Sequence, residues 1–180
     1  MQRKYRAVFL DRDGVINKAK VVGNKPYPPA NAEELEILPG VEQATRLLHE
    51  AGWKLIVVTN QPDVARGKVS ISDVEKINRS LYETLPLDEI RTCFHDDMDN
   101  CACRKPKPGL ILAAAFELRI DLSNSFMVGD RWRDIEAGRS AGCKTCFIDY
   151  RYDEQLRSTP DYRVNSLLDL TQIILGEKDV

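Results

Sequence analysis

The sequence lacks any apolar run that approaches the roughly 20 residues required by a membrane-spanning helix. Its first apolar stretch, residues 7–10, ends at Asp11 after four residues, and nothing near it has the composition of a secretion signal. We therefore expect a protein of the cytoplasm that makes no contact with a membrane.

The sequence also has little net charge. Its 26 basic and 28 acidic residues give a formal charge of −2, which creates no overall field for attracting polyanions. Any phosphate group must then be bound by a local cluster of donors, and we expect no nucleic-acid partner. Internal repeats and low-complexity segments are absent too, which excludes a repeat architecture.

A disulfide framework is not expected either, because five cysteines without a secretion signal favour reduced thiols or metal ligands. Three cysteines and one histidine gather within 11 residues: Cys93, His95, Cys101 and Cys103. They supply enough ligands for a closed tetrahedral Zn²⁺ site, and a closed site is structural. Cys143 and Cys146 flank a predicted strand and are expected to be small core residues.

The rest of the chain alternates between apolar runs and helical patterns. Strands are predicted at residues 6–10, 53–58, 90–94, 125–128, 145–148 and 162–165. Helices are predicted at residues 41–51, 72–85, 108–118 and 167–175, with a further one ending at Ala141 before Gly142. Ser72 and Glu75 are interpreted as a capping box. Residues 18–38 give only turn signals and are predicted to be an extended loop.

Strands that alternate with helices predict an α/β protein with a single Rossmann-like, doubly wound parallel sheet. A chain of 180 residues suits one domain over residues 1–180. The spacing between predicted strands leaves room for one helix and loops at a time, so we expect no cap domain.

Polar residues follow several of these strands. Asp11 and Asp13 follow the first strand, Thr59 follows the second, and Asp130 follows the fourth. Ligands of open parallel sheets bind outside the carboxyl ends of the strands, so these groups are expected to face one crevice. Clustered carboxylates repel unless a cation is present, and an oxygen-rich site of this kind suits Mg²⁺.

The same residues suit phosphoryl transfer. A carboxylate such as Asp11 can be a covalent nucleophile towards phosphorus. The reaction also needs cations and donors around the phosphoryl oxygens, and an acid for the leaving group. Lys105, Thr59 and Asp13 are the candidates for these tasks.

Four short motifs occur in a fixed order along the chain: DRDGVIN at residues 11–17, VVTNQ at 57–61, RKP at 104–106 and VGDRWRD at 128–134. They resemble the four motifs of the haloacid dehalogenase-like phosphatases. The resemblance implies that Asp11 is the nucleophile, Asp13 the general acid and base, and Thr59 and Lys105 the phosphoryl-stabilising residues. It implies a Mg²⁺ ion held by Asp11, the backbone carbonyl of Asp13 and Asp130. Asp134 is expected to support the site, or instead to cap its helix.

The zinc-type loop resembles a subgroup of that family, which holds the heptose 1,7-bisphosphate 7-phosphatases and the histidinol-phosphate phosphatases. The motifs around Thr59 and Lys105 favour the heptose enzymes, which implies a small phosphorylated sugar as the substrate and a role in supplying nucleotide-activated heptose. The resemblance implies four substrate contacts: Asn60, Gln61, Arg104 and Arg131. Pro62-Asp63 departs from the Ser-Gly usual in heptose phosphatases. We expect the zinc loop to fix the direction of Arg104 and Lys105.

Three other interpretations compete with this one. Histidinol phosphate is the alternative substrate. A non-enzymatic zinc module is a second alternative, but Asp96, Asp97 and Asp99 would repel nucleic acid. Response-regulator receivers also carry paired acids, a threonine and a lysine, but no acid follows their acceptor aspartate two residues later, as Asp13 does here. We expect a monomeric enzyme.

Overall fold

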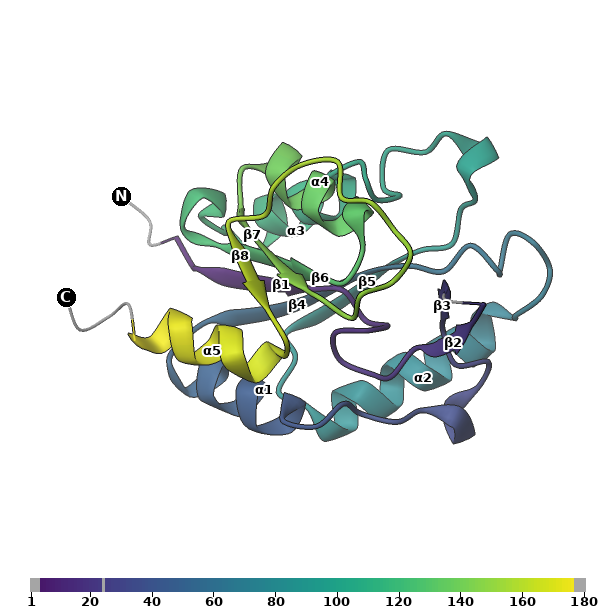
Figure 1. Cartoon of the computed structure of the whole chain (residues 1–180), viewed down its shortest axis with the longest axis horizontal. Helices are drawn as coiled ribbons and strands as arrows, with labels where there is room; N and C mark the ends of the chain where they lie inside the picture. The colour runs from purple at the N-terminus through teal and green to yellow at the C-terminus, as the bar shows by residue number, and fades with distance from the viewer. Residues whose placement is uncertain (1–3, 24, 177–180) are drawn as a thin grey trace.

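The computed structural model describes residues 4–23 and 25–176 and is built on a six-stranded parallel sheet (Figure 1). Its order is β5-β4-β1-β6-β7-β8, and every neighbouring pair is parallel. The strands are β1 (Ala7–Leu10), β4 (Lys54–Asn60), β5 (Glu89–Cys93), β6 (Phe126–Gly129), β7 (Lys144–Ile148) and β8 (Tyr162–Val164). The predicted fold class is confirmed.

Helices cover both faces of the sheet. They are α1 (Val41–Glu50), α2 (Ile71–Thr84), α3 (Gly109–Glu117), α4 (Trp132–Ala141) and α5 (Leu167–Gly176), with short 3₁₀ turns at η1 (Ala32–Glu34), η2 (Asp97–Asp99) and η3 (Leu122–Asn124). Val8 and Leu10 of β1 pack in a core with α1, α2 and α5, whereas Ala7 and Phe9 pack with α3 and α4 (Figure 1). Because both faces are covered, the strand is a continuous apolar run rather than an alternating one.

The predicted capping box of the second helix is wrong by two residues. Helix α2 begins at Ile71, and Ser70, not Ser72, is its N-cap. The Ser70 hydroxyl accepts a hydrogen bond from the backbone N–H of Asp73 at 3.1 Å. The sequence has a serine at both positions, and the helix uses the one that precedes its first apolar residue. The predicted cap of α4 is confirmed, since Gly142 adopts a left-handed conformation with φ of 87°.

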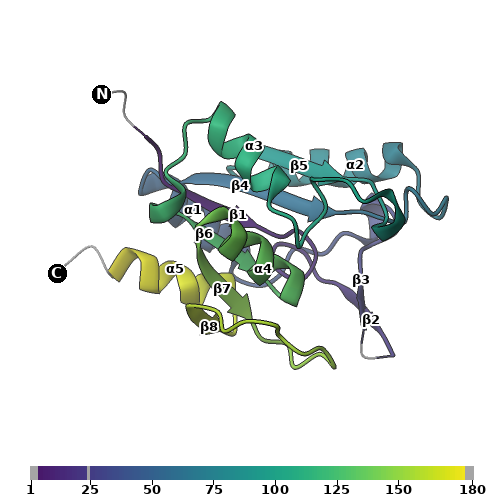
Figure 2. The ribbon, with the colours of Figure 1, turned by 90° about the horizontal axis from the view of Figure 1, so that it is seen from above.

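The segment predicted as an extended loop contains a short antiparallel hairpin, β2 (Lys20–Val22) and β3 (Lys25–Tyr27), followed by η1. Pro26 pairs opposite Val21 in a two-stranded ribbon, where a proline is tolerated because it does not break a central ladder. Because Pro26 gave only a turn signal, the sequence did not predict this strand. The hairpin projects beyond the carboxyl ends of the sheet strands (Figure 2).

Among the described residues, no helix combines the length and the apolar composition that crossing a bilayer would require.

Candidate active site and metal centres

A cleft of about 300 Å³ opens at the carboxyl ends of the central strands. Its floor comes from the loops after β1, β4 and β6 and from Lys105, and its walls come from the hairpin and from several arginines. The lining residues are Asp11, Asp13, Pro26, Tyr27, Pro28, Asn60, Pro62, Asp63, Arg66, Arg104, Lys105, Asp130, Arg131, Arg133 and Asp134. The structure thus brings most of the predicted site residues together.

Lys105 joins two carboxylates on the floor of the cleft. Its Nζ lies 2.8 Å from Asp11 Oδ1 and 2.6 Å from Asp134 Oδ1. Burial raises the pKa of Asp11 to about 7, and the charge of Asp134 adds to this effect. Burial on its own would lower the pKa of Lys105, but Asp11 and Asp134 outweigh it and the pKa is raised. Lys105 therefore stays a cation at the point where phosphoryl oxygens would gather.

Asp130 carries the clearest sign of a cation site. Both of its carboxylate oxygens are buried and have no hydrogen-bond partner within the described residues. Its carboxylate lies with those of Asp11 and Asp134, and one oxygen atom from each of the three lies within 4.8 Å of the other two. Burial raises the pKa of Asp130 well above its ordinary value, and Asp11 adds to this. Three buried carboxylates beside one ammonium leave an excess of negative charge, and all-oxygen donors of this kind fit Mg²⁺.

Gly14 makes room for Asp130. Its φ is +89°, and a Cβ at this position would lie 2.1 Å from Asp130 Oδ2. Only glycine combines this backbone conformation with such a close approach. The loop after β1 can therefore bring Asp11 and Asp13 to the cleft without displacing Asp130.

Asp13 has its own set of donors, separate from the carboxylate cluster. Its Oδ1 accepts from Asn17 Nδ2 at 2.9 Å and its Oδ2 accepts from Gln61 Nε2 at 2.8 Å. The guanidinium of Arg12, which is fully buried, lies 3.3 Å from Asp13 Oδ2. These contacts hold the Asp13 side chain at the cleft wall, where it is 15% exposed.

Thr59, predicted to stabilise the phosphoryl group, and the predicted substrate contacts Asn60 and Gln61 follow one another at the end of β4 but differ in exposure. Thr59 is buried and does not line the cleft. Gln61 is buried, does not line the cleft, and donates to Thr59 Oγ1 at 2.9 Å as well as to Asp13. Asn60 lines the cleft and binds the backbone of Lys105 through two hydrogen bonds. Its Nδ2 donates to the Lys105 carbonyl at 3.0 Å, and its Oδ1 accepts from the Lys105 N–H at 3.1 Å. Asn60 and Gln61 therefore hold neighbouring site residues in place.

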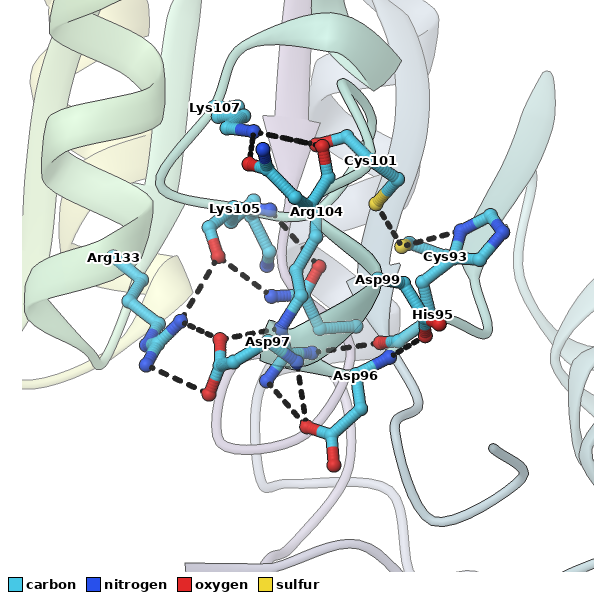
Figure 3. Close-up of polar contacts among 12 residues, drawn as sticks. Cys93, His95, Asp96, Asp97, Asp99, Cys101, Arg104, Lys105, Lys107 and Arg133 are labelled. Carbon is cyan, nitrogen blue, oxygen red and sulfur yellow. Dashed lines mark hydrogen bonds and ion pairs between the residues drawn. The ribbon is translucent and has the colours of Figure 1, made fainter. Parts of the chain in front are cut away.

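The four predicted zinc ligands converge at the end of β5, and Figure 3 shows three of them, Cys93, His95 and Cys101. The Sγ atoms of the three cysteines lie between 3.2 and 3.7 Å apart. The Nδ1 atom of His95 lies 3.6 Å from Cys93 Sγ and 3.4 Å from Cys103 Sγ. Tetrahedral sulfur ligands at ~2.3 Å from zinc would lie about 3.8 Å from each other. The cluster therefore fits Zn²⁺ in both its chemistry and its spacing.

The remaining thiols and the second histidine lie outside this cluster. Cys143 and Cys146 are buried in the two cores, as predicted. His49 is exposed on α1.

Lys107 is exposed, but it stabilises the zinc-type loop through hydrogen bonds. Its Nζ donates to the carbonyls of Asn100 and Cys101 at 3.1 and 3.0 Å (Figure 3).

Each arginine that lines the cleft has a carboxylate partner. Asp97 accepts from Arg104 and from Arg133, Asp96 accepts from Arg66 through two bonds of 2.7 Å, and Glu154 accepts from Arg131. Asp96, Asp97 and Glu154 do not line the cleft themselves. Arg66 also pairs with Asp63 at 3.2 Å, and Asp63 does line the cleft. The other three carboxylates orient the guanidinium groups without occupying the space that they face.

Sequence reasoning missed much of this arrangement. It interpreted Asp96 and Asp97 only as charges that repel phosphate, and it gave no role to Arg12, Arg133 or Glu154. One available signal was the density of arginines in the motif at residues 128–134, where Arg133 follows Arg131 at a helix start.

Comparisons with known proteins agree with this geometry. A family profile for haloacid dehalogenase-like hydrolases matches residues 21–142. The D-glycero-beta-D-manno-heptose-1,7-bisphosphate 7-phosphatase of Helicobacter pylori (strain ATCC 700392 / 26695) is 41% identical over 145 residues, which cover 77% of this chain and 80% of that protein. The enzyme of the same name from Escherichia coli (strain K12) is 33% identical over 189 residues, covering 97% and 96%.

A solved structure is similar over almost the whole fold. The D,D-heptose 1,7-bisphosphate phosphatase from B. bronchiseptica, in complex with magnesium and phosphate, superposes with a TM-score of 0.83 at 30% identity. The match covers 96% of this chain and 99% of that one.

Proposed function

This chain belongs to the haloacid dehalogenase-like hydrolases, and on that premise we propose that it is a Mg²⁺-dependent phosphatase that removes the 7-phosphate of D-glycero-D-manno-heptose 1,7-bisphosphate. The product would feed the synthesis of a nucleotide-activated heptose. The observation that carries the proposal is the cleft itself: its floor holds Asp11, Lys105 and Asp130, and its rim holds four arginines. The relatives named for this activity support it.

In the proposed reaction, a carboxylate oxygen of Asp11 attacks phosphorus, and the bond from phosphorus to the sugar oxygen breaks. Within the described residues, the hydrogen bonds and ion pairs of Asp11 all use Oδ1, which leaves Oδ2 for this attack. Asp13 protonates the departing sugar oxygen and then takes a proton from the water that hydrolyses the aspartyl phosphate. Lys105 and Thr59 stabilise the phosphoryl oxygens.

Mg²⁺ would be held by Asp11, Asp130 and the backbone carbonyl of Asp13, and it would neutralise charge between the attacking carboxylate and the phosphate. Asp134 contacts Lys105 and accepts from the Arg131 N–H at 3.1 Å, so it orients the lysine and caps its helix at once. Both roles expected from the sequence are thus compatible.

Zn²⁺ would occupy the cluster of Cys93, His95, Cys101 and Cys103. Four protein ligands leave no position for water or substrate, so this metal would be structural. It would close the loop that carries Asp96 and Asp97 and precedes Arg104.

The substrate proposal is tested by steady-state kinetics. We expect kcat/KM for D-glycero-D-manno-heptose 1,7-bisphosphate to exceed that for histidinol phosphate by at least about 100-fold. Histidinol phosphate carries an amino group that is a cation, and four arginines on the rim disfavour a cation near them. Equal or reversed values would assign the chain to the histidinol phosphatases instead, and no turnover of either would refute the proposal.

A further inference from the structure

Two arginines from distant parts of the chain meet at Asp97 on the rim of the cleft (Figure 3). Arg104 follows the last zinc-type ligand, and Arg133 lies in the first turn of α4. Arg104 Nε donates to Asp97 Oδ1 at 2.9 Å. Arg133 donates to Oδ1 at 2.9 Å and to Oδ2 at 3.4 Å. One carboxylate therefore bridges two guanidinium groups.

The bridge leaves the cleft open to an anion. Arg104 and Arg133 line the cleft, whereas Asp97 does not and is 54% exposed on the outside. Arg133 also donates to the backbone carbonyl of Lys105 at 3.4 Å, which places the pair beside the catalytic lysine. The bridge itself has two positive charges and one negative charge. Asp96 lies 3.9 Å from Arg104 as well, but it pairs more closely with Arg66, through two bonds of 2.7 Å.

Asp97 also keeps the two arginines together. Without its carboxylate, two guanidinium groups that contact the same oxygen atom would repel each other and separate.

We propose that Arg133 is a further substrate-binding residue and that Asp97 is the positioning residue that holds it beside Arg104, so that both guanidinium groups bind the phosphate that is not hydrolysed. The inference deepens the proposed function, because it requires a substrate with two phosphate groups. Guanidinium groups suit this task, since their planar donors match the oxygens of a phosphate.

Asp97 also links this pair to the zinc-type cluster. It lies between His95 and Cys101, so the loop that the metal would close is the loop that carries the bridge. The bridge thus joins this loop to α4 at the rim of the cleft. A metal that takes no part in the reaction would in this way determine how well a bisphosphate is distinguished from a monophosphate.

The test compares two competitive inhibitors of p-nitrophenyl phosphate hydrolysis, fructose 1,6-bisphosphate and fructose 6-phosphate. The measured quantity is the ratio of the inhibition constant of the monophosphate to that of the bisphosphate. Arg133→Gln should lower this ratio by about 10-fold or more relative to the unmodified protein, since a hydrogen bond to a charged group contributes about that factor.

Arg157→Gln is the matched control. The Arg157 guanidinium lies 3.4 Å from the centre of the Trp132 ring, over which Arg133 also lies at 5.1 Å, but Arg157 does not line the cleft. The Arg157→Gln variant removes one positive charge near Trp132, as Arg133→Gln does, but from outside the cleft. The ratio of the inhibition constants should therefore not change. An equal effect of both variants, or a ratio that survives Arg133→Gln, would overturn the assignment of Arg133.

Asp97 is tested by the same ratio together with zinc content. Asp97→Asn should lower the ratio about 10-fold while the protein retains one zinc per chain, and Asp97→Glu should restore part of it. A ratio that is unchanged or raised in Asp97→Asn would overturn the positioning role. Loss of zinc together with the ratio would assign Asp97 to the folding of the loop instead.

The proposed heptose substrate and the second anion site can be refuted independently of each other. If the unmodified protein prefers the bisphosphate probe but does not hydrolyse heptose 1,7-bisphosphate, the proposed substrate is wrong and the second anion site stands. If the unmodified protein shows no preference between the two probes, the second anion site is refuted whatever the turnover of heptose bisphosphate.

Discussion

The Nζ atom of Lys105 lies 2.6 Å from Oδ1 of Asp134, and both side chains are almost fully buried. Asp134→Asn keeps the size of the side chain and removes its charge. It leaves the buried ammonium with Asp11 as its one carboxylate partner within the described residues, and it also removes a charge that repels Asp11 and Asp130. We therefore expect the free energy of unfolding to fall by about 2 kcal/mol, the contribution of a hydrogen bond to a charged group. Thermal denaturation should show a decrease in Tm of about 4 °C or more.

A matched control for this variant is Glu117→Gln. It breaks an ion pair with Arg91 that is formed by a largely exposed glutamate. Pairs of this kind contribute about 1 kcal/mol or less, so Tm should change little. Equal losses in the two variants would contradict the burial argument.

Asp11→Asn tests the nucleophile. An amide does not attack phosphorus as a carboxylate does, so phosphate release should fall by at least about 1,000-fold. The zinc-type cluster lies at the end of a different strand, and metal analysis should find its zinc content unchanged. Turnover within 10-fold of the unmodified protein would refute the assignment of Asp11.

The raised pKa of Asp11 predicts that Mg²⁺ stabilises the protein more at higher pH. Burial raises this pKa from 3.8 to about 7 in the metal-free protein. A raised carboxyl pKa means that ionisation opposes folding: its contribution to stability is full below about pH 4 and is lost as pH rises through about 7. Mg²⁺ binds the ionised carboxylate and must displace the proton at low pH.

The increase in Tm on adding MgCl₂ should therefore be larger at pH 8 than at pH 5.5. Thermal unfolding at the two values of pH, with and without the metal, measures it. Asp11→Asn should reduce the difference between them. An increase that is the same at both values would show that Asp11 does not titrate in this range.

Cys101→Ser tests the zinc-type cluster. The loss of one thiolate should release the metal and loosen the loop that holds Arg104 and Asp97. We expect the KM for the bisphosphate to rise by about 10-fold and Tm to fall. Cys143→Ala is the control, because it removes a buried thiol outside the cluster and should keep the metal. A protein that contains no zinc before mutation would contradict the assignment of this site.

Gly14→Ala tests the packing of the first loop against Asp130. An added Cβ would lie 2.1 Å from Asp130 Oδ2 at a φ of +89°. Gly52→Ala separates the two effects, because Gly52 has a φ of +81° but no atom within 4 Å of the added Cβ. Both variants should lose about 1 kcal/mol to the backbone conformation. Gly14→Ala should lose more than this and weaken Mg²⁺ binding, whereas Gly52→Ala should bind Mg²⁺ normally.

The sequence predicted those features that depend on neighbouring residues along the chain. A buried strand followed by Asp11 places that carboxylate at the end of the sheet, and four metal-type ligands within 11 residues predict one cluster. It did not predict the ion pair of Asp97 with Arg133, because these residues are 36 positions apart and no periodicity relates them. The hairpin was missed because its prolines resemble those of a loop.

The segment that carries the β2–β3 hairpin is hydrogen-bonded to itself where it leaves and rejoins the sheet, and its η1 turn also contacts α2. Lys18 donates its N–H to the Glu36 carbonyl at 2.8 Å, and Leu38 donates to the Ile16 carbonyl at 2.9 Å, so the segment leaves and returns at one place. It supplies Pro26, Tyr27 and Pro28 to the cleft wall and none of the groups on its floor. Leu35, Ile37 and Leu38 pack against the core, so the part of this segment that can be replaced is the hairpin itself, residues 20–27. We expect such an exchange between relatives to change the sugars admitted while the same chemistry acts on their phosphates.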